Sequence, residues 1–268
     1  MPLGYEVTIF EKQDRPGGLM WSNIPQFRLP AAVLNEEIGY IVDMGVDLRL
    51  GSRIDSMAAV LEEGFDAVFV GSGAPKGKNI ELPGRYDDPD HVHIGITWLE
   101  SVAFGHIESI GERVLVIGVG NTAMDCCRTA IRIGGSDVKV MARKPRGYFK
   151  ASPWELEDAE GEGVEIVENH SPTRFVLEDG RLVGMEFEVF ESREDENGKL
   201  HQESTGTVII PCDDVILAIG QDAAFPWIER DIGIEFGEWG MPVVDRATMQ
   251  STRAGVFFGG DAAWGPEN

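Results

Sequence analysis

Apolar and polar positions along the chain follow two periods, one typical of strands and one typical of helices. Continuous apolar runs predict buried strands at residues 5–10, 46–50, 66–71, 113–117 and 138–142. A helical spacing of apolar positions predicts helices over residues 31–44 and 124–135, and Gly134 and Gly135 end the second helix. Further strands are predicted within residues 164–190 and 207–219 and at residues 255–260.

The segment from residue 113 to residue 142 carries the clearest fold signal. It runs in the order strand, glycine turn, helix, strand, which indicates a right-handed βαβ unit in a parallel sheet. Residues 12–30 are rich in Gly and Pro and predict a long ordered loop, and residues 79–111 predict a linker with a helix. The pattern therefore predicts an α/β fold.

Composition narrows the function classes. The 268 residues suggest about two domains, and the balance of 23 basic against 46 acidic residues gives a net charge of −23. This charge disfavours nucleic acid or an anionic membrane as a partner. No apolar run approaches the roughly 20 residues that span a bilayer, and the N-terminus has no basic signal-peptide region, so we expect a cytoplasmic protein.

The three cysteines, Cys126, Cys127 and Cys212, form no CxxC motif and no regular spacing. They predict neither a disulfide framework nor a redox dithiol nor a metal site. His91 and His93 would share one face of a strand and, with nearby Asp residues, could imitate a metal site; a solvated loop is the favoured interpretation.

The turn after the strand at residues 113–117 matches the dinucleotide fingerprint G-x-G-x-x-G/A, with Gly118, Gly120 and Ala123 at its defining positions. Gly118 would permit the tight turn, Gly120 the close approach of a pyrophosphate, and Ala123 the packing of helix on strand. Asn121 and Thr122 lie between them at the helix N-terminus, where an anion is favoured. An ordinary βα turn is the alternative.

The next strand ends in Arg143 and Lys144, where an acidic residue would favour NAD. A cationic pair suits a 2′-phosphate instead, so NADP(H) is favoured over NAD(H), with Arg146 and Lys150 nearby. There are two alternatives: the cations belong to a solvated turn and bind no nucleotide, or the enzyme uses NADH. Glu155 is interpreted either as lining the nicotinamide side or as an ordinary helix-start carboxylate.

Six segments in order resemble the NADPH-dependent glutamate synthase small-subunit family. They are residues 11–30, 68–74, 113–135, 150–166, 218–221 and 255–265. The resemblance implies two Rossmann-like, three-layer dinucleotide-binding domains of the glutathione-reductase type, the flavin domain incomplete. The implied boundaries are 1–108 for the first part of the FAD-binding domain, 109–221 for the NAD(P)H-binding domain, and 222–268 for the returning part of the FAD-binding domain.

The resemblance also implies cofactor-binding residues beyond the fingerprint. Gly220 lies in the segment that returns from the nicotinamide domain. The residues implied for FAD are Glu11, Lys12, Arg15, Gly17, Gly18, Arg28, Gly73, Gly260 and Asp261. Glu11 and Lys12 would face the adenosine ribose, and Asp261 the ribityl–phosphate region. Compared with the family, we expect a chain that lacks the first strand, its GxGxxG turn and a C-terminal helix.

By the same resemblance, NADPH would give a hydride to FAD, and FAD would pass electrons to iron–sulfur clusters in a missing region or in a partner. The acceptor would be an iron–sulfur protein or a large catalytic subunit. The hydride step requires no side-chain acid or base, so no catalytic residue is predicted. Open strand edges favour a homodimer. The alternative from another class is an NADP(H)-binding or docking module that holds no flavin.

Overall fold

A computed structural model describes residues 3–266 and divides the chain into two compact units. Unit 1 contains the residues up to Lys76 and those from Gln221 onward, and unit 2 contains Gly77–Gly220. The chain passes between them at two short strands, β4 (Lys76–Gly77) and β13 (Gln221–Asp222). Residues 77–108, which the resemblance places in the first flavin segment, belong to unit 2 in the structure.

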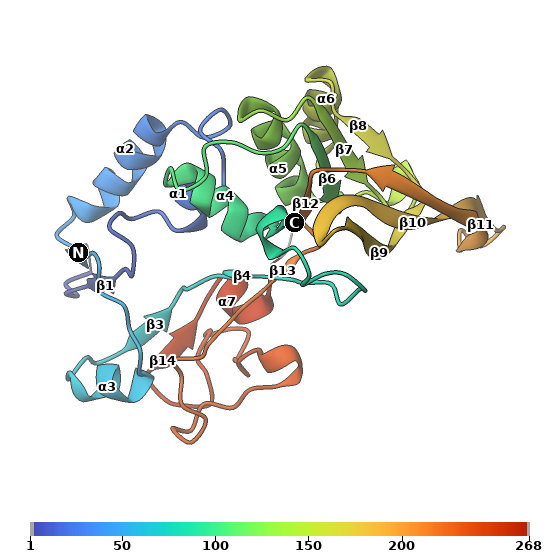
Figure 1. Cartoon of the computed structure of the whole chain (residues 1–268). Coiled ribbons are helices and arrows are strands. Elements are labelled where there is room, and N and C mark those ends of the chain that lie inside the picture. Colours follow the sequence, from blue (N-terminus) through green and yellow to red (C-terminus); the bar gives the residue numbers. More distant parts are fainter. Residues whose placement is uncertain (1–2, 267–268) are drawn as a thin grey trace. The chain divides into compact units, whose positions relative to one another are not determined.

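Unit 2 is built on a five-stranded parallel sheet in the order β5-β12-β6-β7-β8 (Figure 1). The strands are β5 (Val92–Ile94), β6 (Arg113–Ile117), β7 (Asp137–Met141), β8 (Glu165–Val167) and β12 (Asp214–Leu217). Between β6 and β7 lies helix α5 (Asn121–Arg132), as the sequence pattern predicts. The helix begins three residues earlier than its apolar spacing indicates, directly after Gly120.

Side chains of the central strand alternate between two cores because successive residues of a strand point to opposite faces. Val114 and Val116 enter the core beneath α5, α4 (Gly95–Ala103) and α6 (Pro153–Gly161). Leu115 and Ile117 enter the core on the other face. Unit 2 therefore has three layers, with the parallel sheet in the middle.

The third layer is an antiparallel sheet in the order β11-β10-β9. Its strands are β9 (His170–Glu178), β10 (Arg181–Glu194) and β11 (Leu200–Pro211). Phe175, Met185 and Phe187 from this sheet are buried against the parallel sheet. The predicted strand at 207–219 is two strands, because Pro211 ends β11 and the chain then enters β12 in the other sheet.

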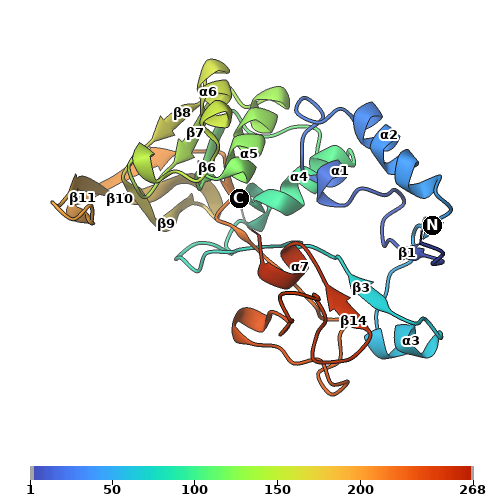
Figure 2. The ribbon, with the colours of Figure 1, turned by 180° about the vertical axis from the view of Figure 1, so that it is seen from behind.

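Unit 1 contains two small parallel sheets. In one, β1 (Thr8–Phe10) pairs with β2 (Asp47–Arg49), and the chain between the two strands contains α1 (Leu19–Ser22) and α2 (Ala31–Val42). In the other, β3 (Val68–Val70) pairs with β14 (Val256–Phe258), and Figure 2 shows α3 (Met57–Glu62) and α7 (Asp261–Trp264) beside them. Phe258, Val256 and Met57 lie in the core of this second part.

Some elements lie where the sequence predicts loop or linker. The loop predicted at 12–30 contains the single turn α1, and α3 was not predicted. The segment at 79–111, predicted as a linker with a helix, contains the helix α4 and also β5 and a 3-10 turn at Pro89–His91. Two other 3-10 turns span Arg146–Tyr148 and Glu238–Gly240. Among the described residues, no helix has the length and apolar character that crossing a membrane requires.

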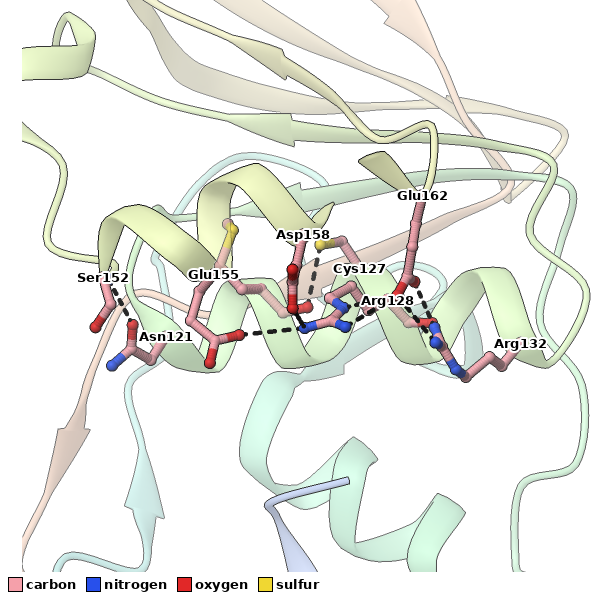
Figure 3. A network of polar contacts seen from close by, with 9 residues as sticks. Asn121, Cys127, Arg128, Arg132, Ser152, Glu155, Asp158 and Glu162 are labelled. Carbon is pink, nitrogen blue, oxygen red and sulfur yellow. Dashed lines mark hydrogen bonds and ion pairs between the residues drawn. The ribbon is translucent and has the colours of Figure 1, made fainter. Parts of the chain in front are cut away.

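An ion-pair network joins α5 to α6 (Figure 3). Arg128 is 7% exposed, and its guanidinium contacts the carboxylates of Glu155 at 3.3 Å and Glu162 at 2.9 Å. Arg132, one turn further along α5, also donates to Glu162, at 2.9 Å. Hydrogen bonds from Arg132 and Arg128 lower the pKa of Glu162 to about 2. The network places Glu155 within the α5–α6 contact.

The stability of unit 2 should fall as the pH drops from about 4.5 towards 2. Folding lowers the pKa of Glu162, so its ionised form stabilises the folded state and protonation removes that stabilisation. Glu162→Gln should lower the free energy of unfolding at neutral pH by about 1–2 kcal/mol and flatten its acid dependence. Urea unfolding at several pH values measures this. Glu157→Gln, on an exposed position of α6, is the control; equal acid slopes for wild type and Glu162→Gln would contradict the prediction.

Candidate nucleotide-binding site

The turn between β6 and α5 is shaped by backbone contacts. Gly118 has φ +122°, and a Cβ on it would lie 2.2 Å from the carbonyl oxygen of Ala218, so a side chain is excluded there. Gly120 has an ordinary φ of −100°, and a Cβ on it would meet nothing within 4 Å. Ala123, in the first turn of α5, is fully buried. Gly118 and Ala123 thus serve packing, while Gly120 leaves open space at the helix N-terminus.

A second segment is docked on this turn. The backbone N–H groups of Lys150 and Ala151 donate to the carbonyl oxygen of Val119, at 3.1 and 2.9 Å. The side-chain oxygen of Asn121 accepts a hydrogen bond from the backbone N–H of Ser152 at 2.9 Å (Figure 3). Asn121 therefore holds the start of α6 beside the turn, a contact that the sequence did not indicate. Thr122 is half-buried in the first turn of α5.

Arg143 and Lys144 lie at the same edge of the sheet as the glycine turn. β6 and β7 pair in parallel with Ile117 opposite Met141, and the Gly118 N–H donates to the Met141 carbonyl at 3.2 Å. The side chains of Arg143 and Lys144 are exposed and form no ion pair within residues 3–266. The two cations are therefore accessible to an anionic ligand next to the glycine turn.

The neighbouring cation Arg146 is differently placed. Its guanidinium donates to both carboxylate oxygens of Glu160, at 2.5 and 2.7 Å, and this contact raises its pKa. Its backbone N–H donates to Glu168 at 2.7 Å. Lys150 has an exposed side chain. Of the four cations in this stretch, Arg146 is thus neutralised by the protein.

Gly220 follows β12, on the other side of β6 from β7. It has φ +119° and an exposed backbone, with the side chain of Lys78 3.4 Å from a built Cβ. The structure thus gathers seven of the sequence-predicted residues after the carboxyl ends of the adjacent strands β6 and β7, with Gly220 after the neighbouring β12: Gly118, Gly120, Asn121, Thr122, Ala123, Arg143 and Lys144. Ligands of parallel α/β sheets bind at this edge.

The residues implied for FAD lie in unit 1, in the segments that follow strands β1, β3 and β14. At the end of β1, the carboxylate of Glu11 accepts the backbone N–H of Gln13 at 2.9 Å, and Lys12 is exposed. Arg15 donates to Asp14 at 2.9 Å and lies 4.0 Å from the ring centroid of Trp21. Glu11 and Arg15 are thus engaged by their own loop.

Glycines in unit 1 differ in what surrounds them. Gly17 (φ +121°) is closely packed, since a Cβ would lie 3.1–3.3 Å from side chains of α1 and α2. Gly18, Gly73 and Gly260 have positive φ values and open space at the Cβ position. Gly260 precedes Asp261, the first residue of α7, and Arg28 is half-buried. The open backbone at Gly18, Gly73 and Gly260 fits close approach by a phosphate-bearing ligand.

In the described part of the chain, no group of three or more His, Cys, Asp or Glu side chains is arranged to hold a metal ion. The rings of His91 and His93 both contact Oδ1 of buried Asp214, His93 at 2.8 Å and His91 at 3.3 Å. The other oxygen of Asp214 accepts the Gly111 N–H at 2.8 Å. The favoured interpretation as a solvated loop was wrong for His93, which lies on β5 and joins it to the start of β12.

The three cysteines are free and buried. Burial raises the pKa of the Cys126 thiol well above its usual range, and raises those of Cys127 and Cys212 to about 12. A thiol with such a pKa is a poor nucleophile at neutral pH.

The chain is similar to known reductases along most of its length. The family model described as pyridine nucleotide-disulphide oxidoreductase matches residues 32–268. The NADP(+)-dependent formate dehydrogenase subunit beta of Moorella thermoacetica is 35% identical over 98% of this chain and 38% of that protein. The glutamate synthase [NADPH] small chain of Halomonas elongata is 33% identical over 98% of this chain and 59% of its own length. The chain thus spans about 40–60% of these relatives.

Solved structures share the fold. Mycobacterium tuberculosis FprA in complex with NADPH superposes with a TM-score of 0.79 at 15% identity, over 98% of this chain and 73% of that one. Thioredoxin reductase of T. acidophilum gives a TM-score of 0.68 at 18% identity, over 97% of this chain and 83% of that one. The predicted α/β fold of the glutathione-reductase type and the predicted family resemblance are confirmed, and the chain belongs to the pyridine nucleotide-disulphide oxidoreductase family.

Proposed function

We propose that this chain is an oxidoreductase module in which unit 2 binds NADPH and unit 1 contributes to binding FAD, in an assembly that passes electrons to an iron–sulfur acceptor. The observation that carries the NADPH assignment is the pair of exposed, unpaired cations Arg143 and Lys144 beside the Gly118–Ala123 turn. The relatives support it, since they are named as NADP(+)- or NADPH-dependent proteins.

Different residues of unit 2 are suited to bind different parts of NADP(H). The open space at Gly120 and the N-terminus of the twelve-residue helix α5 suit the pyrophosphate. Arg143 and Lys144, with Lys150 on the segment docked against Val119, supply positive charge for the 2′-phosphate. Because Arg146 is held by Glu160, it adds little to that charge.

In unit 1, the open glycine backbones at Gly18, Gly73 and Gly260 would accommodate the flavin's phosphates and ribityl chain, with Asp261 bonding to hydroxyl groups. FAD, when bound, accepts a hydride and releases single electrons. The residues of this chain bind and orient the two cofactors, and no side chain is needed to move a proton in the hydride step. The names "subunit beta" and "small chain" of the relatives support a partner subunit as the electron acceptor.

A second candidate is an NADP(H)-binding module that holds no flavin by itself. It is favoured by the distribution of the predicted residues. Those for NADP(H) gather at one edge of one sheet, whereas those for FAD follow strands of two separate small sheets. Flavin retention distinguishes the two candidates.

Replacing Arg143 and Lys144 together by Ala should weaken NADP(H) binding roughly 10- to 100-fold, because two charge-assisted contacts to the 2′-phosphate are lost, and should leave NAD(H) binding unchanged. Calorimetric titration with NADP⁺ and NAD⁺ measures both. Arg146→Ala is the matched control and should change NADP⁺ affinity by less than about threefold, because Glu160 already engages this guanidinium. Equal losses for the two nucleotides would refute the 2′-phosphate assignment.

The purified chain, mixed with FAD and desalted, should retain a flavin absorption spectrum that NADPH bleaches under anaerobic conditions. The Arg143→Ala/Lys144→Ala variant should retain the flavin and require far more NADPH for bleaching. If the chain binds NADP⁺ but retains no flavin, the oxidoreductase assignment fails for the chain by itself, and the second candidate is correct.

Electron transfer in this chain should not involve thiols. An aryl disulfide reagent at about pH 8 should label none of the three cysteines within minutes in the native chain and all of them after unfolding, because their pKa values are raised by burial. A rapidly labelled cysteine, or one whose labelling rate changes when NADPH is added, would show that a thiol takes part.

A further inference from the structure

The hairpin of β10 and β11 extends past the strand that supports it. β10 and β11 pair from Gly184–Pro211 out to Glu194–Leu200, whereas pairing of β10 with β9 ends at Val189–His170. The outer half of the hairpin, from Phe190 to Ser204, therefore has no third strand beside it. A long two-stranded ribbon of this kind is marginally stable by itself, so its contacts with the rest of unit 2 are informative.

One such contact is between β11 and the backbone of Arg143. The side-chain amide of Gln202 on β11 donates to the carbonyl oxygen of Arg143 at 2.8 Å and to the hydroxyl of Ser192 at 3.2 Å. Ser192 in turn donates to the side chain of Asn169 at 2.5 Å, and the Asn169 carbonyl accepts the Phe190 N–H at 3.0 Å. Asn169 has φ +60°, which Asn tolerates better than most residues. These hydrogen bonds join the hairpin to Asn169, in the connection between β8 and β9, and to the backbone of Arg143.

A second contact reaches Lys144 through an aromatic ring. Glu194, at the end of β10, accepts a hydrogen bond from the Tyr148 hydroxyl at 2.9 Å, and this contact raises the pKa of Tyr148. The ammonium of Lys144 lies 5.3 Å from the centroid of the Tyr148 ring, within the range of a cation–π interaction. The hairpin thus holds a ring against which Lys144 rests.

We propose that the outer half of the β10–β11 hairpin is a positioning element for 2′-phosphate recognition, in which Gln202 fixes the backbone of Arg143, and Glu194 fixes the Tyr148 ring beneath Lys144. The proposal rests on the assignment of the 2′-phosphate to Arg143 and Lys144. Its physical basis is pre-organisation: a backbone at Arg143 and a ring at Tyr148 that are already held in place reduce the cost of ordering this connection when a ligand binds. Neither Gln202 nor Tyr148 needs to touch the nucleotide.

The test compares two ligands that differ only in the 2′-phosphate, adenosine 2′,5′-bisphosphate and adenosine 5′-monophosphate, by calorimetric titration of the whole chain. Gln202→Ala should weaken binding of the bisphosphate about three- to tenfold and leave the monophosphate unchanged, the size expected for one hydrogen bond. Tyr148→Phe, which keeps the ring but loses the bond to Glu194, should weaken bisphosphate binding by a smaller factor. Thr207→Ala, on an exposed position of the same strand, should change neither.

Coupling to Arg143 separates positioning from a general structural role. In an Arg143→Ala background, Gln202→Ala should have no further effect on bisphosphate binding, because the side chain that it positions is gone. Hydrogen exchange of residues 142–148 should be faster in Gln202→Ala than in wild type, with unchanged exchange in α5.

Each outcome bears on one proposal or on both. If wild type does not prefer the bisphosphate, the 2′-phosphate assignment and the hairpin proposal both fail. If wild type prefers it and Arg143→Ala abolishes the preference while Gln202→Ala binds like wild type, only the hairpin proposal is overturned. An equal loss of both ligands in Gln202→Ala also overturns it, since that result indicates general loss of structure.

Discussion

The candidate site depends on the close packing of the backbone at Gly118 against the backbone at Ala218. The carbonyl oxygen of Ala218 occupies the place that a Cβ on Gly118 would need. This contact lets β6 turn sharply beside the end of β12 and begin α5 at once. The docking of Lys150 and Ala151 on the Val119 carbonyl follows from that turn. A larger residue at 118 would displace the turn from β12 and with it the segment leading into α6.

Charge pairing sorts the cations of unit 2 into two groups. Arg128, Arg113 and Arg146 are each engaged by carboxylates and join elements of the fold. Arg143 and Lys144 are left exposed at a sheet edge, although the chain as a whole carries an excess of acidic residues. Because no carboxylate of residues 3–266 forms an ion pair with Arg143 or Lys144, both charges face solvent at the edge where an anionic ligand would bind.

Glycine is needed for different reasons at different positions of the chain. In unit 2, Gly118 is required by a close backbone contact, and in unit 1 Gly17 is required by side chains of α1 and α2. Gly18, Gly73 and Gly260 have positive φ but no close neighbour, so the protein's own packing does not exclude a side chain there. Open backbone of this kind is useful for ligand approach, and these glycines support the proposed contribution of unit 1 to flavin binding.

The sequence by itself determined the local units and the family. Apolar periodicity and the glycine spacing are local properties, so β6, α5 and β7 followed from residues 113–142, and the cationic pair followed from the position where β7 ends. The helix α3 was missed, because its six residues make less than two helical turns and give too little helical periodicity to detect. Only the tertiary structure decided which side chains are available. Glu160 engages Arg146, Ser152 engages Asn121, and Gln202 reaches Arg143 across 59 positions of the sequence. Such contacts depend on how strands and loops meet in space, so the spacing of residues along the chain does not predict them.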